Sequence, residues 1–132
     1  MTLNIGDMFS TTRKVTDELI RQFADVSGDR NPIHLDDEFA KTTQFGKRIA
    51  HGMLGAAFIS AVLGYEMRDQ KVVYLSQSLQ FLKPVFLDDM VSAEATVTKI
   101  REDKPIVTLE TICKNQDGDV LIKGEAVVLL LS

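Results

Sequence analysis

The residues of this chain best suited to chemistry lie in its first half and include its only two histidines, His34 and His51. Asp29 is an acceptor and a potential base, and His34 can donate or accept a proton near neutral pH. Between them, Asn31 can orient a water molecule. His51 is followed directly by Gly52. The set therefore has the groups needed to hold water and to move a proton.

Gly52 adds a backbone group, because it lies at the start of an apolar helix predicted over residues 51–63. The first N–H groups of a helix have no partner within it and carry partial positive charge. They can therefore stabilise an oxyanion that develops nearby. Glycine leaves this position open because it has no side chain. After the histidine, Ser60 is the only polar residue of the segment, so the helix is expected to be buried on most sides.

The same residues also allow a purely structural explanation. The sequence Asp-x-Asn-Pro favours a turn, and an Asx-type turn accounts for Asp29, Asn31 and Pro32 without any chemistry. His51 can be an ordinary residue at a helix start, and the Ser60 hydroxyl can bond back to a carbonyl of its own helix. The spacing by itself favours the structural explanation, because short motifs often match by chance.

The elements that must position these residues begin with a helix predicted from the capping residue Thr16 to Gly28, which ends it. Pro32 offers no backbone donor and restricts the residue before it, so residues 29–34 are expected to form an ordered loop. A short helix is predicted over residues 36–41. The first half of the chain is therefore helical and rich in loops.

Alternation of period two begins after Gln70 and predicts four long strands. Their expected ranges are 72–82, 90–100, 106–115 and 120–131. Short connections, including the hairpin signal Asp117-Gly118, imply a mostly antiparallel sheet. We expect this sheet to curl around the apolar helix and to bury it on the concave face. Because no repeat or linker interrupts the pattern, residues 1–132 are predicted to form a single α+β domain.

Composition excludes several function classes. The single cysteine, Cys113, forms no internal disulfide, and with only two histidines a zinc site is not expected. A net charge of −4 removes the broad basic surface that non-specific nucleic-acid binding requires. The longest apolar stretch, residues 52–63, is shorter than the about 20 residues that span a bilayer. The N-terminus also lacks a secretory signal, so a cytoplasmic protein without a membrane partner is expected.

Three runs of sequence resemble one known family. The run FADVSGDRNPIHLD at residues 23–36 and the run AHGML at residues 50–54 resemble the hydratase-2 motif of the MaoC-like (R)-specific enoyl-CoA hydratases. The run YLSQSLQFLKPV at residues 74–85 is similar to the same family. The resemblance implies a hot-dog fold, in which a long curved antiparallel sheet wraps a central helix. This agrees with the α+β pattern of the elements.

The resemblance also implies a role for each candidate residue. Asp29 and His34 match the catalytic pair of the family, and Gly52 matches the glycine whose N–H binds the thioester oxygen. Asn31 matches a residue that assists the pair, and Ser60 matches a serine of the site. Eight helical residues separate Ser60 from Gly52, about 12 Å along the axis, so the two cannot bind the same oxygen. Ser60 is therefore expected to line the pocket more deeply.

The implied substrate is an acyl-CoA thioester. Its acyl chain is expected in an apolar channel beside Met53, Leu54, Phe58 and Ile59, most of which also fit ordinary core packing. The phosphates of coenzyme A require local positive charge. The candidate cations are Lys47, Arg48, Lys71, Lys83 and Arg101.

The implied reaction is the reversible hydration of trans-2-enoyl-CoA to (R)-3-hydroxyacyl-CoA. The Gly52 N–H and the helix dipole stabilise the charge that moves onto the thioester oxygen. Asp29 and His34 are expected to hold and deprotonate a water molecule, and one of them returns a proton to the α-carbon. No cofactor or metal is expected, since coenzyme A is part of the substrate. The resemblance further implies a homodimer or higher homo-oligomer with sites near the interface.

Three alternatives stay open. The same chemistry on a carrier-protein thioester would make the chain a (3R)-hydroxyacyl-ACP dehydratase. A hot-dog acyl-CoA thioesterase would instead hydrolyse the thioester, and a non-catalytic module would only bind acyl-CoA. The motif from Asp29 to His34 argues against hydrolysis, and the match at every catalytic position argues against a module without activity.

Overall fold

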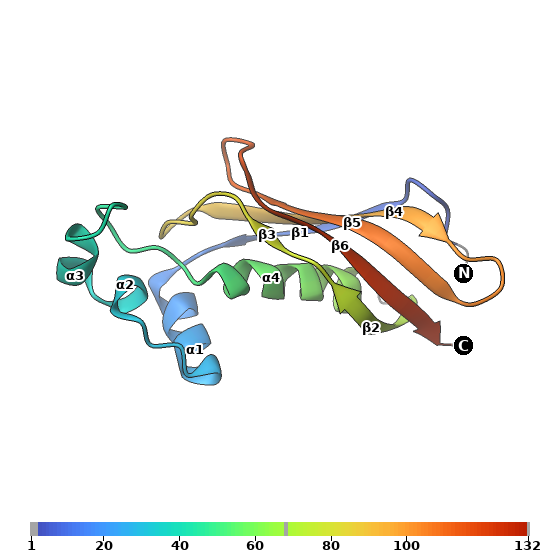
Figure 1. The fold of residues 1–132 in the computed structure, drawn as a ribbon, viewed down its shortest axis with the longest axis horizontal. Coiled ribbons are helices and arrows are strands. Elements are labelled where there is room, and N and C mark those ends of the chain that lie inside the picture. Colours follow the sequence, from blue (N-terminus) through green and yellow to red (C-terminus); the bar gives the residue numbers. More distant parts are fainter. Residues whose placement is uncertain (1–2, 68, 132) are drawn as a thin grey trace.

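A curved antiparallel sheet lies over one long helix in the computed structural model, which describes residues 3–67 and 69–131 (Figure 1). The helices are α1 (Asp17–Ser27), α2 (Pro32–Leu35), α3 (Asp37–Lys41) and α4 (Gly52–Ala61), and the π-helix η1 (Val62–Glu66) continues α4. The strands are β1 (Met8–Lys14), β2 (Lys71–Gln77), β3 (Gln80–Phe81), β4 (Met90–Ile100), β5 (Ile106–Lys114) and β6 (Val120–Leu131). The single-domain prediction also includes residues 1–2, 68 and 132, which lie outside the described residues.

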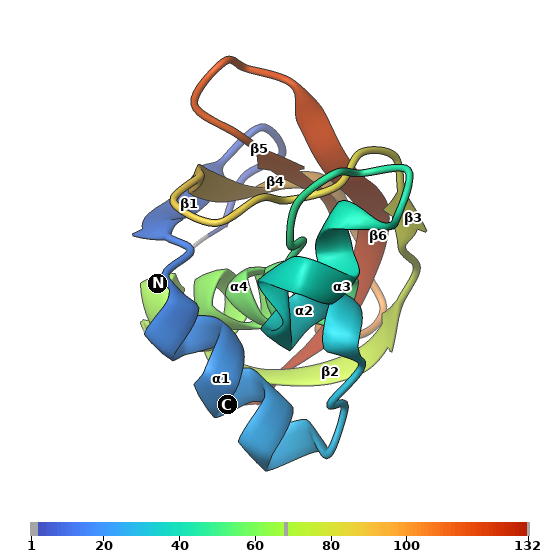
Figure 2. The same ribbon diagram turned by 90° about the vertical axis from the view of Figure 1, so that its left-hand side faces the viewer.

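The sheet has the strand order β1-β4-β5-β6-β2, with β3 paired to β6, and all of its pairings are antiparallel. Period-two alternation sets which face is buried. In β4 the buried residues alternate with partly exposed ones, and they are Val91, Ala93, Ala95 and Val97. Seen end-on, the sheet curls around α4, while α1, α2 and α3 gather at the N-terminal end of α4 (Figure 2). The predicted α+β architecture is therefore confirmed.

Helix α4 buries only one of its faces in this chain. Its buried residues are Leu54, Gly55, Phe58 and Ile59. A Cβ atom added to Gly55 would lie 2.6 Å from Cδ1 of Ile122, so glycine lets the helix approach the sheet closely here. The opposite face is exposed at Met53, Ala57, Ser60 and Ala61. The prediction that α4 is buried on most sides is therefore wrong for the single chain, because no element among the described residues covers that second apolar face.

Local signals predicted several elements closely. The Thr16 hydroxyl accepts a hydrogen bond from the N–H of Leu19 at 3.1 Å, and Gly28 ends α1 with a φ of 80°. The short helix α3 is present where residues 36–41 predicted it. Strands β4, β5 and β6 agree with their predicted ranges to within one residue. These elements have strong caps or clean alternation, so their sequences are sufficient to identify them.

Two predictions along the chain are wrong. The segment expected as one loop over residues 29–34 contains the helical turn α2, because Pro32 stands at its first position, where a missing N–H costs nothing. The strand expected over residues 72–82 is two strands, β2 and β3, with a break at Ser78. There the Ser78 carbonyl lies against β6, and a Cβ atom on Gly124 would be 1.8 Å from its oxygen.

Strand β1 was not predicted at all. Its sequence, MFSTTRK, is mostly polar and exposed, and Phe9 packs against the core. It pairs with β4 along its whole length, from Met8 opposite Thr96 to Lys14 opposite Met90. Pairing rather than alternation defines this strand. Within the described residues, no helix has the length and apolar character needed to cross a membrane.

Candidate active site

The candidate residues meet where the loop after α1 lies against the start of α4. In this loop the Asp29 carboxylate accepts from the N–H of Asn31 at 3.3 Å. The Asn31 side chain in turn accepts from the N–H of Ile33 at 3.1 Å and caps α2. The turn explanation is therefore correct for these side chains, and the same turn carries His34. The structural and the chemical explanations are both compatible with the site.

His34 is buried and oriented through its own ring. Its Nδ1 lies 2.8 Å from the carbonyl oxygen of Ile49. Because a carbonyl only accepts, Nδ1 carries the proton and Nε2 keeps a lone pair. Burial lowers the pKa of His34, against the opposing effects of the Ile49 carbonyl and the Asp29 carboxylate, while His51 and Arg48 lower it further. His34 is thus set up as a neutral base with a free Nε2.

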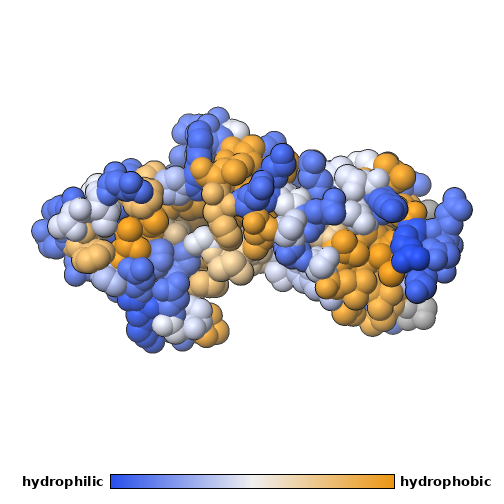
Figure 3. Space-filling view, in the orientation of Figure 1, coloured by the Kyte–Doolittle hydropathy of each residue, from blue (hydrophilic) through white to orange (hydrophobic). Residues whose placement is uncertain are grey.

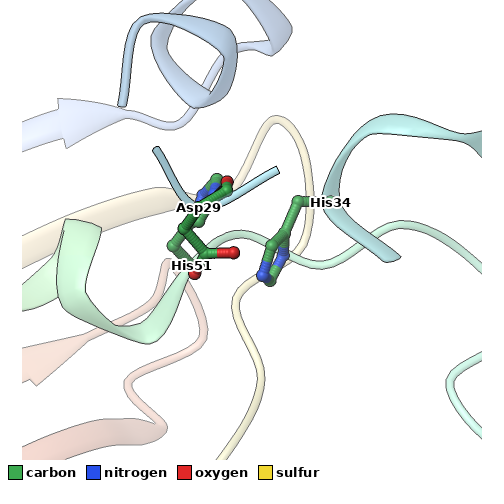
Figure 4. A group of neighbouring side chains, drawn as sticks. All are labelled: Asp29, His34 and His51. Carbon is green, nitrogen blue, oxygen red and sulfur yellow. Dashed lines mark hydrogen bonds between the residues drawn. The ribbon is translucent and has the colours of Figure 1, made fainter. Parts of the chain in front are cut away.

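Asp29, His34 and His51 come together as a cluster. One oxygen or nitrogen atom from each lies within 4.8 Å of the others, and Asp29 is exposed while both histidines are buried. Figure 4 shows the Asp29 carboxylate facing the ring of His34. A water molecule between an exposed carboxylate and a buried neutral imidazole can be both held and deprotonated. Side chains of these types can also bind a metal ion, so the absence of a metal from the reaction stays a prediction.

His51 has a larger part in this cluster than its sequence position indicated. Its ring stacks on the His34 ring, with centroids 3.9 Å apart and planes at 29°. The Phe23 ring also contacts it, with the two centroids 4.9 Å apart. Its Nε2 lies 2.8 Å from the carbonyl oxygen of Asp29. It caps no N–H of α4 with its side chain. From the sequence alone, His51 is expected only to mark the helix start, and its one signal is its position directly before Gly52.

Gly52 is the first residue of α4 and lies beside the cluster. A Cβ atom at this position would be 2.9 Å from two ring carbons of Phe81, so glycine lets this ring approach the start of the helix. Gly52 also lines a cavity of about 310 Å³ together with Phe45, Ile49 and Lys83. The helix N-terminus therefore opens toward a space that a substrate can enter.

Ser60 and Met53 lie away from the cluster, on the open face of α4. Both line a cavity of about 550 Å³ between α4 and β2, which is mostly apolar. Phe23 lines the same cavity and also contacts His51, so the cavity begins near the cluster. The other expected channel residues, Leu54, Phe58 and Ile59, are instead buried in the core. Of the predicted channel, only Met53 is on the cavity wall.

The five candidate cations separate into two groups. Arg48 is 6% exposed and bonds to Asp17 and to the His34 carbonyl, so the prediction that it binds phosphate is wrong. Arg101 pairs with Asp103 in the β4–β5 hairpin, and Lys71 begins β2; both are remote from the start of α4 (Figure 1).

Lys47 and Lys83 lie on the side of Gly52. The Lys47 ammonium lies 4.3 Å from the ring centroid of Phe86, and Nζ of Lys83 lies 3.4 Å from Oδ1 of Asp119. Both line a polar cavity of about 320 Å³, and Lys83 also lines the cavity at Gly52. Two lysines are therefore near the Gly52 end of the site, although the polar cavity that they share is also lined by Asp89, Asp117 and Asp119.

Comparison with known proteins identifies the family. The model of the MaoC like domain matches residues 4–116. The (R)-specific enoyl-CoA hydratase of Aeromonas caviae is 44% identical over 128 residues, which cover 97% of this chain and 96% of that protein. The (R)-specific enoyl-CoA hydratase of Rhodospirillum rubrum is 43% identical over 125 residues, covering 95% and 86%. A solved structure of the (R)-hydratase from A. caviae involved in PHA biosynthesis has a TM-score of 0.95 and covers 98% of both chains. This chain therefore belongs to the MaoC-like domain family and has its hot-dog fold.

Proposed function

We propose that this chain is a hydro-lyase that reversibly hydrates trans-2-enoyl-CoA to (R)-3-hydroxyacyl-CoA. The observation that carries the proposal is the cluster of Asp29 and His34 at the N-terminus of α4, where Gly52 is the first residue. The 44% identity to an (R)-specific enoyl-CoA hydratase, over nearly the full length of both chains, supports the reaction and its stereochemistry.

Asp29 and His34 share the water molecule in this proposal. Nε2 of His34 has a lone pair because Nδ1 donates to Ile49, and the Asp29 carboxylate faces the same space. One of the pair takes a proton from the water as its oxygen bonds to the β-carbon. This proton, given back directly or after transfer to the other member of the pair, then passes to the α-carbon on the same face of the double bond. H and OH are added across the bond, and the pair returns to its starting state.

Gly52 and Asn31 support this step in different ways. As the β-carbon is attacked, negative charge moves onto the thioester oxygen, where the N–H at the start of the ten-residue helix α4 stabilises it. Asn31 assists by holding the pair in place, since its N–H donates to Asp29 and its side chain caps the turn that carries His34. Both groups act through geometry that exists before substrate binds.

The acyl chain is placed in the cavity between α4 and β2, along Met53 and Ser60. The phosphates of coenzyme A are placed near Lys47 and Lys83, beyond Gly52. The thioester then lies between these two ends, beside the cluster. No separate cofactor or nucleic-acid partner is proposed, and a cytoplasmic location stays a prediction from sequence.

A homodimer is also proposed. Strand β2 is the edge of the main sheet, and its exposed side chains include Val73, Tyr74 and Leu75. Figure 3 shows hydrophobic surface gathered at the lower right, where β2 and β6 run in Figure 1. An unpaired apolar edge favours pairing with another chain. Light scattering on the eluted protein should give a dimer, and Val73→Glu should weaken it more than Val26→Glu on α1.

The activity itself is tested with crotonyl-CoA, the matching crotonyl carrier protein and chiral analysis of the product. We expect (R)-3-hydroxybutyryl-CoA, with no release of free thiol. Asp29→Asn and His34→Ala should each lower turnover by at least about 100-fold with the fold retained. Asp25→Asn, an exposed acid on α1, is the matched control and should not change turnover. Near-normal turnover in both site variants would disprove the proposal, and preference for the carrier-protein substrate would favour the dehydratase alternative.

A further inference from the structure

We infer that His51 is a positioning residue, whose buried ring fixes the positions of Asp29 and His34 relative to the N-terminus of α4. The inference rests on the proposed function for the identity of the reaction. Its evidence is a set of contacts that the proposed chemistry does not use. His51 is 2% exposed, and it touches both members of the pair without taking part in proton transfer.

The first contact fixes Asp29. Nε2 of His51 lies 2.8 Å from the Asp29 carbonyl oxygen, 22 residues away in sequence. Because this carbonyl only accepts, Nε2 must carry the proton. Nδ1 of His51 is then bare, and it is buried with no hydrogen-bond partner among the described residues. The neutral ring with its proton on Nε2 is the form that fits this environment.

The second contact fixes the plane of His34. The two imidazoles are stacked at 3.9 Å, while Phe23 of α1 lies 4.9 Å from the His51 ring. His51 is 2% exposed and contacts both rings, so close packing restrains its rotation. The His34 ring is held within its plane by the Ile49 carbonyl and across its face by His51. Its free Nε2 therefore points in one fixed direction.

The third relationship is covalent. His51 is the residue before Gly52, and its backbone is the N-cap of α4. The oxyanion donor and the ring that orients the pair therefore belong to adjacent residues. A shift of α4 relative to the loop at Asp29 would change both contacts together. Because a misplacement of about 1 Å can cost about 100-fold in rate, this connection bears directly on turnover.

Two substitutions separate the two functions of the ring. His51→Phe keeps an aromatic ring for stacking and removes the donor to Asp29. His51→Gln keeps an amide donor near the position of Nε2 and removes the ring. We expect each to lower kcat by about 10- to 100-fold, with KM for crotonyl-CoA changed by less than about threefold. Val91→Ala, which truncates a buried core residue of β4, controls for lost stability and should leave kcat unchanged.

The pH profile gives a readout that lost packing alone would not move. The charged and titratable groups that act on His34 are Asp29, His51 and Arg48, and His51 lowers its pKa. A charge on the stacked His51 ring opposes a charge on His34, so removing the imidazole in either variant should move the acid limb of kcat/KM to higher pH. Wild-type kcat and an unmoved acid limb in both variants would overturn the inference. If Asp29→Asn and His34→Ala were also fully active, the proposed function would fail instead.

A measurement on the unaltered protein keeps the test independent of variant folding. With only two histidines, ¹⁵N-labelled imidazoles give two sets of NMR signals. We expect opposite neutral tautomers near pH 7, with the proton on Nδ1 in His34 and on Nε2 in His51. A neutral His51 ring with its proton on Nδ1 would overturn the inference, because Nε2 would then have no proton to donate to the Asp29 carbonyl.

Discussion

Arg48 and Asp17 form an ion pair of 2.6 Å between segments 31 residues apart in sequence. The arginine is 6% exposed, whereas the aspartate is about half exposed. Nε of Arg48 also donates to the carbonyl of His34 at 2.8 Å. One buried guanidinium therefore joins the first turn of α1 to the turn that carries His34, and its donors are engaged within the protein.

Replacing Arg48 by methionine should lower both stability and turnover. Hydrogen bonds to charged groups contribute about 1.5 to 3 kcal/mol, and the half-exposed Asp17 places this case toward the lower figure. Arg21→Met is the matched control, because Arg21 pairs with the same carboxylate at 3.0 Å from an exposed position. Urea unfolding should show the larger loss for Arg48→Met. Equal losses in the two variants would contradict the special place of Arg48.

The same pair should make stability depend on pH. Arg48, and then Arg21, hold the pKa of Asp17 below its usual value of 3.8. A lowered carboxyl pKa stabilises the folded state above the unfolded value, and this contribution is lost as pH falls through the folded pKa. The acid decline in unfolding free energy should therefore be shallower in Arg48→Met than in the wild type. Parallel declines would rule out this contribution.

Activity should persist into mildly acidic solution. Burial lowers the pKa of His34 from 6.5, so the neutral base remains available as pH falls below that value. The acid limb of kcat/KM for crotonyl-CoA is therefore expected below 6.5, and titration of the His34 ring by NMR should follow it. An acid limb at or above 6.5 would contradict the neutral, buried imidazole.

The close approach of α4 to β6 predicts energetic coupling between Gly55 and Ile122. Gly55→Ala places a methyl group 2.6 Å from Cδ1 of Ile122, and Ile122→Val removes that atom. Overpacking costs about 1 to 3 kcal/mol, whereas Ile→Val alone costs about 0.5 to 1.5 kcal/mol. In a double-mutant cycle, Ile122→Val should therefore cost less in the Gly55→Ala background than in the wild type. Additive costs would show that the two residues are not in tight contact.

Substitution of Gly124 should not be relieved in the way that substitution of Gly55 is, because a Cβ atom at Gly124 meets backbone atoms rather than a side chain. A Cβ atom there meets the Ser78 carbonyl oxygen at 1.8 Å, and the Ser78 N–H is held by Glu125 at 2.9 Å. No side-chain truncation relieves this contact. Gly124→Ala should therefore lower unfolding free energy by at least the about 1 to 3 kcal/mol typical of overpacking, with or without Gln77→Ala.

Cys113 should be chemically silent in the folded protein. Burial, with a smaller effect of Glu94, raises the pKa of its thiol to about 12. The thiolate is the reactive form, so an aromatic disulfide reagent at pH 8 should react slowly with native protein. In denaturing urea the same protein should release one equivalent of chromophore at once. Rapid stoichiometric reaction without denaturant would show that the thiol is accessible.

Much of the architecture follows from signals within short stretches of sequence. Thr16 and Gly28 mark the ends of α1 through their own chemistry, and clean alternation identifies β4, β5 and β6. The motif containing Asp29 and His34 likewise lies within one short continuous segment, residues 29–34. Strand β1 could not be recognised this way, because its polar residues acquire strand geometry only by pairing with β4.

The sequence by itself therefore determined the candidate site residues, the α+β class and most elements. The tertiary structure decided how those groups are held. His51 reaches Asp29 across 22 residues, and Arg48 reaches Asp17 across 31. Contacts of this kind have no local signature, since they depend on where the sheet and α4 bring separate loops together. Only the folded chain shows that these two side chains support the site.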